Sequence, residues 1–275
     1  MDIHNDSIIE LNNGTPIPRV GLGMYQIPDG SAAMHAVSYA LEVGYRHIDT
    51  AMMYGNETSV GKAVRESGLP REEIFITTKL WNDDHGYDEA INAFHQSLKS
   101  LDLGYVDLYL IHWPVEEKRG DSWRALETLY EEGLCRAIGV SNYMTWHLDE
   151  LMASCRVKPA VNQVEFSPFL YLRDLLERCR RDEIVLEAYS PLTKGKRLGD
   201  ERLMAIAAEL GRSPAQVLIR WALQHDLVVI PKSVRPEHIL ANNDVFDFSI
   251  PSAQMEQLDD MNEDLRTSWD PSKQK

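Results

Sequence analysis

Four ionisable side chains of different types follow three consecutive strand-like runs of the sequence. Asp49 and Tyr54 follow the second run of the chain, Lys79 follows the third and His112 follows the fourth. Each has a simpler explanation when taken alone. Asp49 could cap a loop, Tyr54 could be an aromatic residue at the rim, Lys79 could be a solvated charge, and His112 could be a histidine with its hydrogen bonds made inside the fold. A carboxylate, a phenol, an ammonium and an imidazole after adjacent strands can exchange protons with one another and with a substrate. Together they predict a catalytic site.

The elements that must position these side chains alternate between short β-branched runs and longer segments of helical period, from about residue 45 to about residue 245. Such alternation is typical of βα units and a parallel sheet. The expected strands are Val20–Gly23, Tyr45–Ile48, Ile74–Thr78, Val106–Ile111, Ala137–Val140, Ala160–Val164, Ile184–Ala188 and Val228–Ile230. The expected helices between them are Ala32–Val43, Ser59–Glu66, Glu89–Leu101, Ser122–Glu132, Thr145–Ala153, Arg173–Arg181, Glu201–Leu210 and Pro236–Asn242.

Eight strands that are each followed by a helix predict a (β/α)8 TIM barrel, and an open doubly wound sheet is the alternative. Residues 8–11 and 15–18 flank the turn sequence Asn12-Asn13-Gly14, which predicts a β-hairpin that closes the bottom of the barrel. Ser213-Pro214 predicts the start of an extra helix that ends at Gln224. No domain boundary is visible, so we expect one domain over residues 1–275. Only the tail from Trp269 to Lys275 is expected to be loosely held.

Composition narrows the class of protein. Hydrophobic residues make up 44% and charged residues 26% of the 275 residues, which is typical of a globular chain and not of a fibrous, disordered or membrane one. The formal net charge of −15 disfavours nucleic acid as a partner. The first residues lack the basic and apolar regions of a secretory signal, and no stretch is apolar enough to span a membrane. We therefore expect a cytoplasmic protein without a membrane partner.

Two motifs suggest other functions but fail on their own context, and the metal-binding motifs are absent. Gly21-Leu-Gly23 starts like a dinucleotide fingerprint, but Gln26 stands at the third glycine position. The segment from Gly55 to Lys62 has one residue too many for a phosphate-binding loop, and Ala63 stands where Ser or Thr would hold magnesium. The nine histidines form neither His-Glu-x-x-His nor His-x-His on the first strand, so we expect no metal.

The sequence resembles the aldo-keto reductase family over almost its whole length. The resemblance rests on three motifs: Gly44-Tyr-Arg-His-Ile-Asp-Thr-Ala51, Ile138-Gly-Val-Ser-Asn142 and Ile230-Pro-Lys-Ser233. Within the family the chain is similar to the short bacterial members of the diketogluconate-reductase type, because only residues 115–121 separate His112-Trp113-Pro114 from the next helix.

The resemblance implies NADPH-dependent reduction of aldehydes or ketones, including keto-sugars and diketogluconate-like compounds. Tyr54 is then the general acid, and Asp49, Lys79 and His112 complete a catalytic tetrad. A free tyrosine is a poor acid near neutral pH, so we expect the Lys79 ammonium to lower the pKa of Tyr54. Asp49 would hold Lys79, and His112 would orient and polarise the carbonyl oxygen.

The resemblance also implies the residues of the cofactor site. Ser141, Asn142 and Gln163 match positions that bind the nicotinamide carboxamide, and Tyr189 matches the aromatic residue that stacks on its ring. Plain packing at the barrel rim is the alternative for Tyr189, and a solvated charge run is the alternative for residues 232–235. The expected cofactor residues are Gly23, Met24, Ser141, Asn142, Gln163, Tyr189, Ser190, Leu192, Lys232, Ser233, Val234, Arg235, His238 and Asn242.

Two positions depart from the family pattern. His238 stands where the family usually has arginine, and Ala241 stands where it usually has glutamate, whereas Asn242 is retained. Because a histidine carries little charge at neutral pH, we expect NADPH to be preferred and NADH to be used at a measurable rate. Lys232 and Arg235 remain to bind the 2′-phosphate.

Aromatic residues are expected to wall the substrate pocket. Tyr25, Trp81 and Trp113 would form it together with His112, and Trp269 would fold back over the mouth. We expect a small-molecule carbonyl substrate and a monomeric protein. The alternative class is a regulatory or structural protein that binds a nicotinamide cofactor on the same barrel and turns it over only incidentally.

Overall fold

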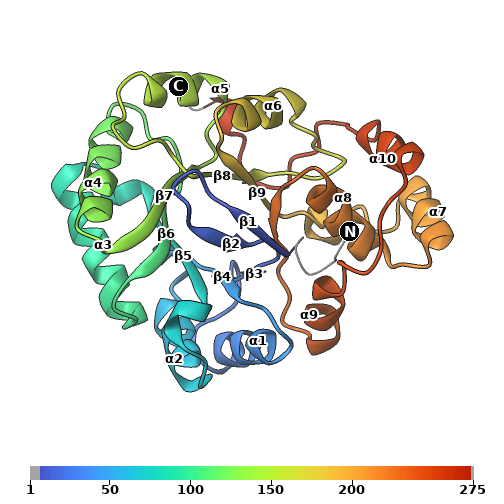
Figure 1. The fold of residues 1–275 in the computed structure, drawn as a ribbon, viewed down its shortest axis with the longest axis horizontal. Helices are drawn as coiled ribbons and strands as arrows, with labels where there is room; N and C mark the ends of the chain where they lie inside the picture. Colours follow the sequence, from blue (N-terminus) through green and yellow to red (C-terminus); the bar gives the residue numbers. More distant parts are fainter. Residues whose placement is uncertain (1–6, 274–275) are drawn as a thin grey trace.

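The computed structural model describes residues 7–273, and its centre is a ring of eight parallel strands (Figure 1). The strands follow one another around the ring in chain order, as expected of βα units that each add one neighbour. They are β3 (Leu22–Gly23), β4 (His47–Asp49), β5 (Phe75–Leu80), β6 (Val106–Ile111), β7 (Cys135–Ser141), β8 (Val161–Glu165), β9 (Val185–Tyr189) and β10 (Val228–Ile230).

The ring closes between its first and last strands. Val20 forms a parallel bridge with Val229, and the Gly21 N–H donates to the Val229 carbonyl oxygen at 2.8 Å. A Cβ atom on Gly23 would lie only 2.8 Å from the Ile230 carbonyl oxygen, so this close approach requires glycine. The expected (β/α)8 barrel is therefore confirmed, and the open doubly wound alternative is wrong.

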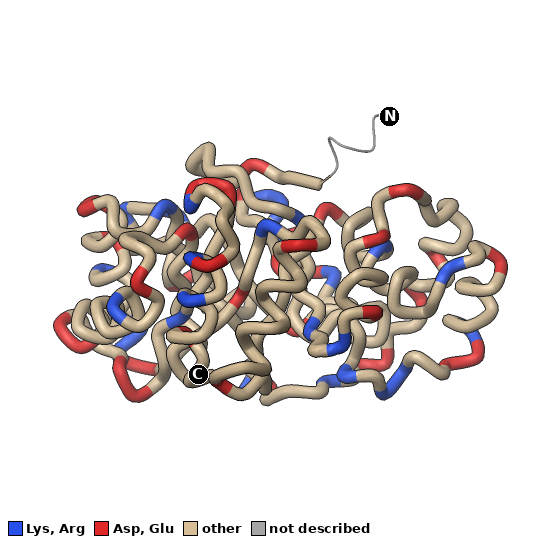
Figure 2. The backbone as a smooth tube through the Cα atoms, turned by 90° about the horizontal axis from the view of Figure 1, so that it is seen from below, with Lys and Arg blue, Asp and Glu red and all other residues tan. Residues whose placement is uncertain are grey.

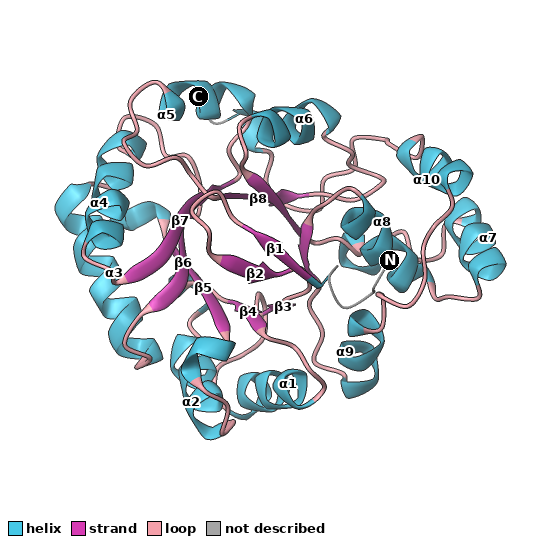
Figure 3. Ribbon diagram, viewed as in Figure 1, coloured by secondary structure: helices cyan, strands magenta, loops and turns pink. Residues whose placement is uncertain are grey.

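Helices surround the ring (Figure 3). They are α1 (Ser31–Glu42), α2 (Glu57–Glu66), α3 (Tyr87–Leu101), α4 (Arg119–Glu131), α5 (Thr145–Met152), α6 (Arg173–Arg181), α7 (Glu201–Leu210), α8 (Pro214–Gln224), α9 (Pro236–Asn243) and α10 (Ser252–Asp259). The extra helix α8 begins where expected, with the Ser213 hydroxyl accepting the Gln216 N–H. The helix α10 was not predicted from the sequence, because only Leu258 in it is buried and so exposed a helix has little hydrophobic period.

The predicted N-terminal hairpin is present as β1 (Ile8–Glu10) and β2 (Pro16–Pro18), which pair antiparallel. Leu11 and Ile17 pack in one apolar cluster with residues of β5, β6, β7, β8 and β10. The hairpin therefore closes one end of the barrel. In Figure 2 it lies on the opposite face of the molecule from the C-terminal tail, and the other end of the ring is free to carry a site.

Acidic and basic residues are distributed along the backbone on both the upper and the lower side of the view in Figure 2. No helix in the described part of the chain is long and apolar enough to cross a membrane. Within residues 7–273, no group of three or more His, Cys, Asp or Glu side chains has an arrangement that could hold a metal ion.

Candidate active site

A buried ion pair lies at the carboxyl ends of β4 and β5. Lys79 is the last but one residue of β5 and is 0% exposed, so the alternative of a solvated charge is wrong. Its Nζ atom lies 2.7 Å and 2.8 Å from the two carboxylate oxygens of Asp49 and 2.9 Å from the Thr50 carbonyl oxygen. A buried ammonium needs partners of this kind, and these three oxygens come from the last residue of β4 and the residue after it.

The same ammonium reaches Tyr54, whose hydroxyl lies 3.5 Å from Lys79 Nζ. Tyr54 belongs to a short 3-10 turn, residues 52–54, that Gly55 ends with a φ of 68°, a backbone angle that favours glycine. The buried Asn56 then fixes this loop, because its amide nitrogen donates to the carbonyl oxygens of Met24 and Ile27. Local turn chemistry therefore aims the phenol back at the ion pair.

The pKa of Tyr54 differs from the sequence-based expectation. Burial, followed by the negative charge of Asp49, raises the pKa of Tyr54 well above its ordinary value. The expected lowering by Lys79 is wrong for this structure, because the ammonium is already paired with Asp49 and the phenol is removed from water. Tyr54 is therefore held in its protonated form, which is the form that a proton donor needs.

His112 follows β6 and completes the predicted tetrad. Its ring centroid lies 5.7 Å from that of Tyr54 and 5.2 Å from that of Trp81. Burial, assisted by the charge of Lys79, lowers the pKa of His112 well below its ordinary value. The imidazole is therefore neutral and has one N–H to donate.

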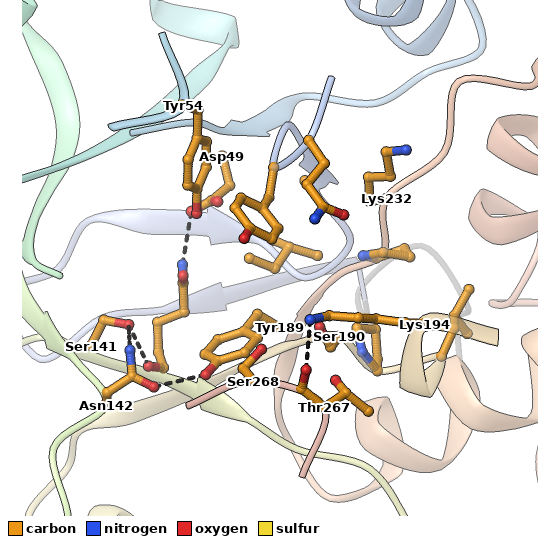
Figure 4. A pocket seen from close by; sticks show the side chains of 18 of the residues that line it. Asp49, Tyr54, Ser141, Asn142, Tyr189, Ser190, Lys194, Lys232, Thr267 and Ser268 are labelled. Atoms are coloured by element: carbon orange, nitrogen blue, oxygen red, sulfur yellow. Dashed lines mark hydrogen bonds between the residues drawn. The ribbon is translucent and has the colours of Figure 1, made fainter. Parts of the chain in front are cut away.

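A cavity of about 630 Å³ opens above these side chains (Figure 4). Asp49, Tyr54 and His112 line it, whereas Lys79 lies beneath, behind the other three. The predicted cofactor residues that line it are Gly23, Ser141, Asn142, Gln163, Tyr189, Ser190, Leu192 and Lys232. The predicted cofactor residues that lie outside it are Met24, Ser233, Val234, Arg235, His238 and Asn242.

A hydrogen-bonded group covers one wall of the cavity at the ends of β7, β8 and β9. The Asn142 amide nitrogen donates to the His112 carbonyl oxygen at 3.0 Å, and its amide oxygen accepts the Tyr189 hydroxyl at 2.8 Å. The Ser141 hydroxyl donates to the Gln163 carbonyl oxygen at 2.8 Å. Figure 4 shows Tyr189 between this group and the side chains of Lys194 and Lys232, and Tyr189 lines the cavity.

The amide of Gln163 is oriented by two acids. Its nitrogen donates to Asp49 Oδ2 at 2.8 Å and to Glu187 Oε2 at 2.8 Å, which uses both amide hydrogens. The amide oxygen is therefore the atom of this side chain that remains to bind a ligand.

Cations and indoles take opposite sides of the mouth. Trp81 and Trp113 follow β5 and β6, whereas Lys194 and Lys232 follow β9 and β10, which stand across the ring of eight. Lys194 was not predicted from the sequence, although its position two residues after Ser190-Pro191-Leu192 could have indicated it. Arg235 and His238 are exposed at the start of α9, beyond the cavity.

The C-terminal tail closes the mouth. Trp269 is 60% exposed, yet its ring centroid lies 5.4 Å from that of Trp113 and 6.4 Å from that of Trp81. The predicted return of Trp269 over the mouth is confirmed, and the expectation of a loose tail is wrong for this residue. Residues after 273 lie outside the described part of the chain.

The buried carboxylate of Glu165, at the end of β8, anchors this tail. It accepts the backbone N–H groups of Thr267 and Ser268 at 2.6 Å and 3.0 Å, and also the Thr267 hydroxyl. Lys194 donates to the Thr267 carbonyl oxygen at 2.7 Å from the other side. Thr267 and Ser268 consequently line the cavity, which no local sequence pattern indicates.

Comparison with known proteins agrees with this geometry. A model of the aldo/keto reductase family matches residues 19–263. Glyoxal reductase of Bacillus subtilis is 48% identical, over 96% of this chain and 95% of the relative. An aldo-keto reductase from a Medee basin deep-sea metagenome library superposes with a TM-score of 0.94 at 44% identity, over 97% of this chain and 98% of that one.

A further solved relative is a Gox0644 mutant in complex with NADPH. It is 40% identical, with a TM-score of 0.92 over 98% of each chain. Matches of this extent leave no part of the barrel unaccounted for, and the chain belongs to the aldo/keto reductase family of oxidoreductases.

Proposed function

We propose that this protein, as one domain of residues 1–275, is an NADPH-dependent carbonyl reductase in which Tyr54 is the general acid. One observation carries the proposal: the Tyr54 hydroxyl lies 3.5 Å from an ammonium that is itself held at 2.7 Å by Asp49, on the floor of a cavity. A proton donor must be protonated before the reaction and stabilised after it. Burial keeps the Tyr54 phenol protonated before the reaction, and the charge of Lys79 stabilises the phenolate after it.

The cavity fits a nicotinamide dinucleotide. Tyr189 offers an aromatic face, the Gln163 amide oxygen can accept from a carboxamide, and Lys194 and Lys232 place positive charge where phosphates would lie. The NADPH complex of the 40% identical relative supports the choice of cofactor. We propose that Lys232 and Arg235 bind the 2′-phosphate and that NADH is used at a lower rate.

When bound, the cofactor supplies a hydride to the carbonyl carbon. Tyr54 donates its proton to the carbonyl oxygen, so the C=O group becomes CH–OH and a phenolate remains. Lys79 balances the charge of that phenolate, and Asp49 keeps Lys79 in place. Neutral His112 donates its N–H to the carbonyl oxygen and stabilises the negative charge that develops there.

The indole side of the mouth favours uncharged substrates. Tyr25, Met53, Trp81, Trp113 and Trp269 line the cavity, and its only lysines or arginines among the described residues are Lys194 and Lys232, across the ring. A carboxylate beside the indoles would lose water without gaining a partner. We therefore propose neutral aldehydes and ketones, including small dicarbonyls such as the one named for the Bacillus relative, over keto-acids.

The test is the loss of NADPH absorbance with paired substrates, such as phenylglyoxal and phenylglyoxylate. We expect turnover of the aldehyde at a kcat/KM at least tenfold above that of the acid. Cofactor binding without consumption of NADPH by any carbonyl would contradict the proposal and favour a regulatory binding protein. The cytoplasmic location and the monomeric state stay predictions.

A further inference from the structure

A second buried carboxyl group lies beside the Asp49–Lys79 ion pair and takes no part in the steps above. Glu187 is on β9, is 0% exposed, and points into the barrel, away from α6 on the outer face of the strand. Its Oε2 atom accepts from Gln163 Nε2, the same nitrogen that donates to Asp49, with both distances 2.8 Å. One amide group therefore ties Glu187 to the carboxylate that holds Lys79.

The other oxygen of Glu187 has no hydrogen-bond partner among the described residues. His47 Nε2, on β4, lies 3.6 Å from it. His47 Nδ1 lies 3.3 Å from the Pro18 carbonyl oxygen, so this nitrogen carries the ring proton and Nε2 is left as an acceptor. Burial lowers the pKa of His47 to about 3, so the ring offers no positive charge to an ionised Glu187.

The charges that act on Glu187 come from few neighbours. The charge of Asp49 on β4 raises the pKa of Glu187, and the charge of Lys79 on β5 lowers it. The neighbouring strand β10, Val228–Ile230, has no titratable group. The carboxylate of Glu165 on β8 accepts the backbone N–H groups of Thr267 and Ser268 in the C-terminal tail. Burial, followed by the charge of Asp49, raises the pKa of Glu187 to about 8, so Glu187 is a neutral carboxylic acid at neutral pH.

We propose that Glu187 is a positioning residue for carbonyl reduction: in its protonated form it holds Gln163 and Asp49 for catalysis, and its ionisation converts the site to a less active form. The proposal rests on the function proposed above. Once Glu187 is ionised, one amide group must hold two anions, and a second negative charge acts on Tyr54. That charge raises the pKa of Tyr54 further, so the phenol is a weaker acid and its phenolate is less stable.

The first experiment compares the pH dependence of kcat/KM for the wild type and Glu187→Gln. The variant keeps the size and an acceptor oxygen for Gln163 but cannot ionise. Wild-type activity is expected to fall as the pH rises through about 8, whereas the variant should not, so their ratio should change about tenfold between roughly pH 7 and pH 9.5. A basic limb at the same pH in both proteins would overturn the proposal.

A matched control is Glu127→Gln on α4. Glu127 is also a buried acid, 1% exposed, but it binds the backbone N–H groups of Arg156 and Val157, away from the cavity. Its variant should retain the wild-type basic limb. Loss of the limb in both variants would show a general effect of buried charge and overturn the specific role of Glu187.

A second experiment needs no substrate. An unfolded glutamate ionises near pH 4.3, so between about pH 4.3 and pH 8 the folded state binds a proton that the unfolded state has lost. The contribution of the neutral Glu187 to the free energy of unfolding is complete below about pH 4.3 and is lost as the pH rises to about 8. The Tm of Glu187→Gln should therefore rise relative to wild type from about pH 5 to about pH 8, and that of Glu127→Gln should not.

The two experiments separate the possible failures. A Tm difference that does not change with pH shows an ionised Glu187 and overturns the inference. The expected Tm trend without any reductase activity overturns the proposed function and the positioning role with it, but leaves the neutral acid in place. Activity with an unmoved basic limb overturns the positioning role alone.

Discussion

The floor of the cavity and the exposed segment of residues 232–242 differ in how their charged side chains are partnered. The cavity floor, which consists of Asp49, Tyr54, Lys79 and His112, is buried or half-buried, and its side chains contact one another. The cation arm, residues 232–242, exposes Lys232, Arg235 and His238, and none of these three forms an ion pair within the described chain. Proton transfer requires a fixed, dry geometry, whereas phosphate binding requires cations that are free until the phosphate arrives.

The difference has an energetic reason. A buried ammonium without a partner would be very costly, so the floor must carry its own counter-ion. An exposed cation without a partner has almost no desolvation cost, and it gains a charge-assisted hydrogen bond when an anion binds. Changes on the floor should therefore affect turnover and stability together, and changes on the arm should affect only the choice of cofactor.

Removal of the phenol hydroxyl should have the largest effect. Tyr54→Phe keeps the ring but removes the proton donor, so kcat/KM for carbonyl reduction should fall about 10²-fold or more. NADPH affinity, measured by fluorescence titration, should stay within a few-fold of wild type. Turnover close to wild type would show that Tyr54 is not the general acid.

Lys79→Met tests the ion pair itself. Activity should fall at least tenfold at every pH near neutrality, because no charge balances the phenolate. Thermal unfolding should also show a loss of about 3–5 kcal/mol, since Asp49 is left buried and unpaired. The double variant Asp49→Asn, Lys79→Met should recover stability but not activity. Recovery of both would mean that the pair only supports the fold.

On the arm, Arg235→Ala should narrow the preference for NADPH over NADH by about tenfold or more. A charge-assisted hydrogen bond to the 2′-phosphate contributes about 1.5–3 kcal/mol, and NADH has only a hydroxyl there. The measurement is the ratio of kcat/KM for the two cofactors, with Tm unchanged. Lys196→Ala is the control, since Lys196 is exposed and does not line the cavity. An equal change in both variants would refute a specific phosphate contact.

His238→Arg should have the smallest effect and the most specific one. An arginine is charged and can bind a phosphate through two parallel hydrogen bonds, which a histidine cannot do. The variant should therefore prefer NADPH more strongly than wild type, measured as the ratio of kcat/KM for the two cofactors. An unchanged ratio would show that residue 238 points away from the ribose.

The sequence predicts the floor better than it predicts the layer beneath it. Asp49, Lys79 and His112 stand at the ends of strands, where barrel topology alone brings side chains together. Glu187 lies inside a strand, and its contact with Gln163 depends on the register that pairs these two residues across β8 and β9. Register and the return of a distant tail are tertiary properties, so neither the buried acid nor Thr267 and Ser268 could be found from local pattern.

The anchor of the tail has a consequence for how such a protein can diverge. Glu165 binds backbone N–H groups at positions 267 and 268, and only the Thr267 hydroxyl adds a side chain to the contact. A carboxylate that binds main chain places few demands on the residues it fixes. The segment that follows can consequently change in sequence and length over generations while the barrel stays the same. Substrate range can therefore change through the C-terminal segment without any substitution among the residues of the cavity floor.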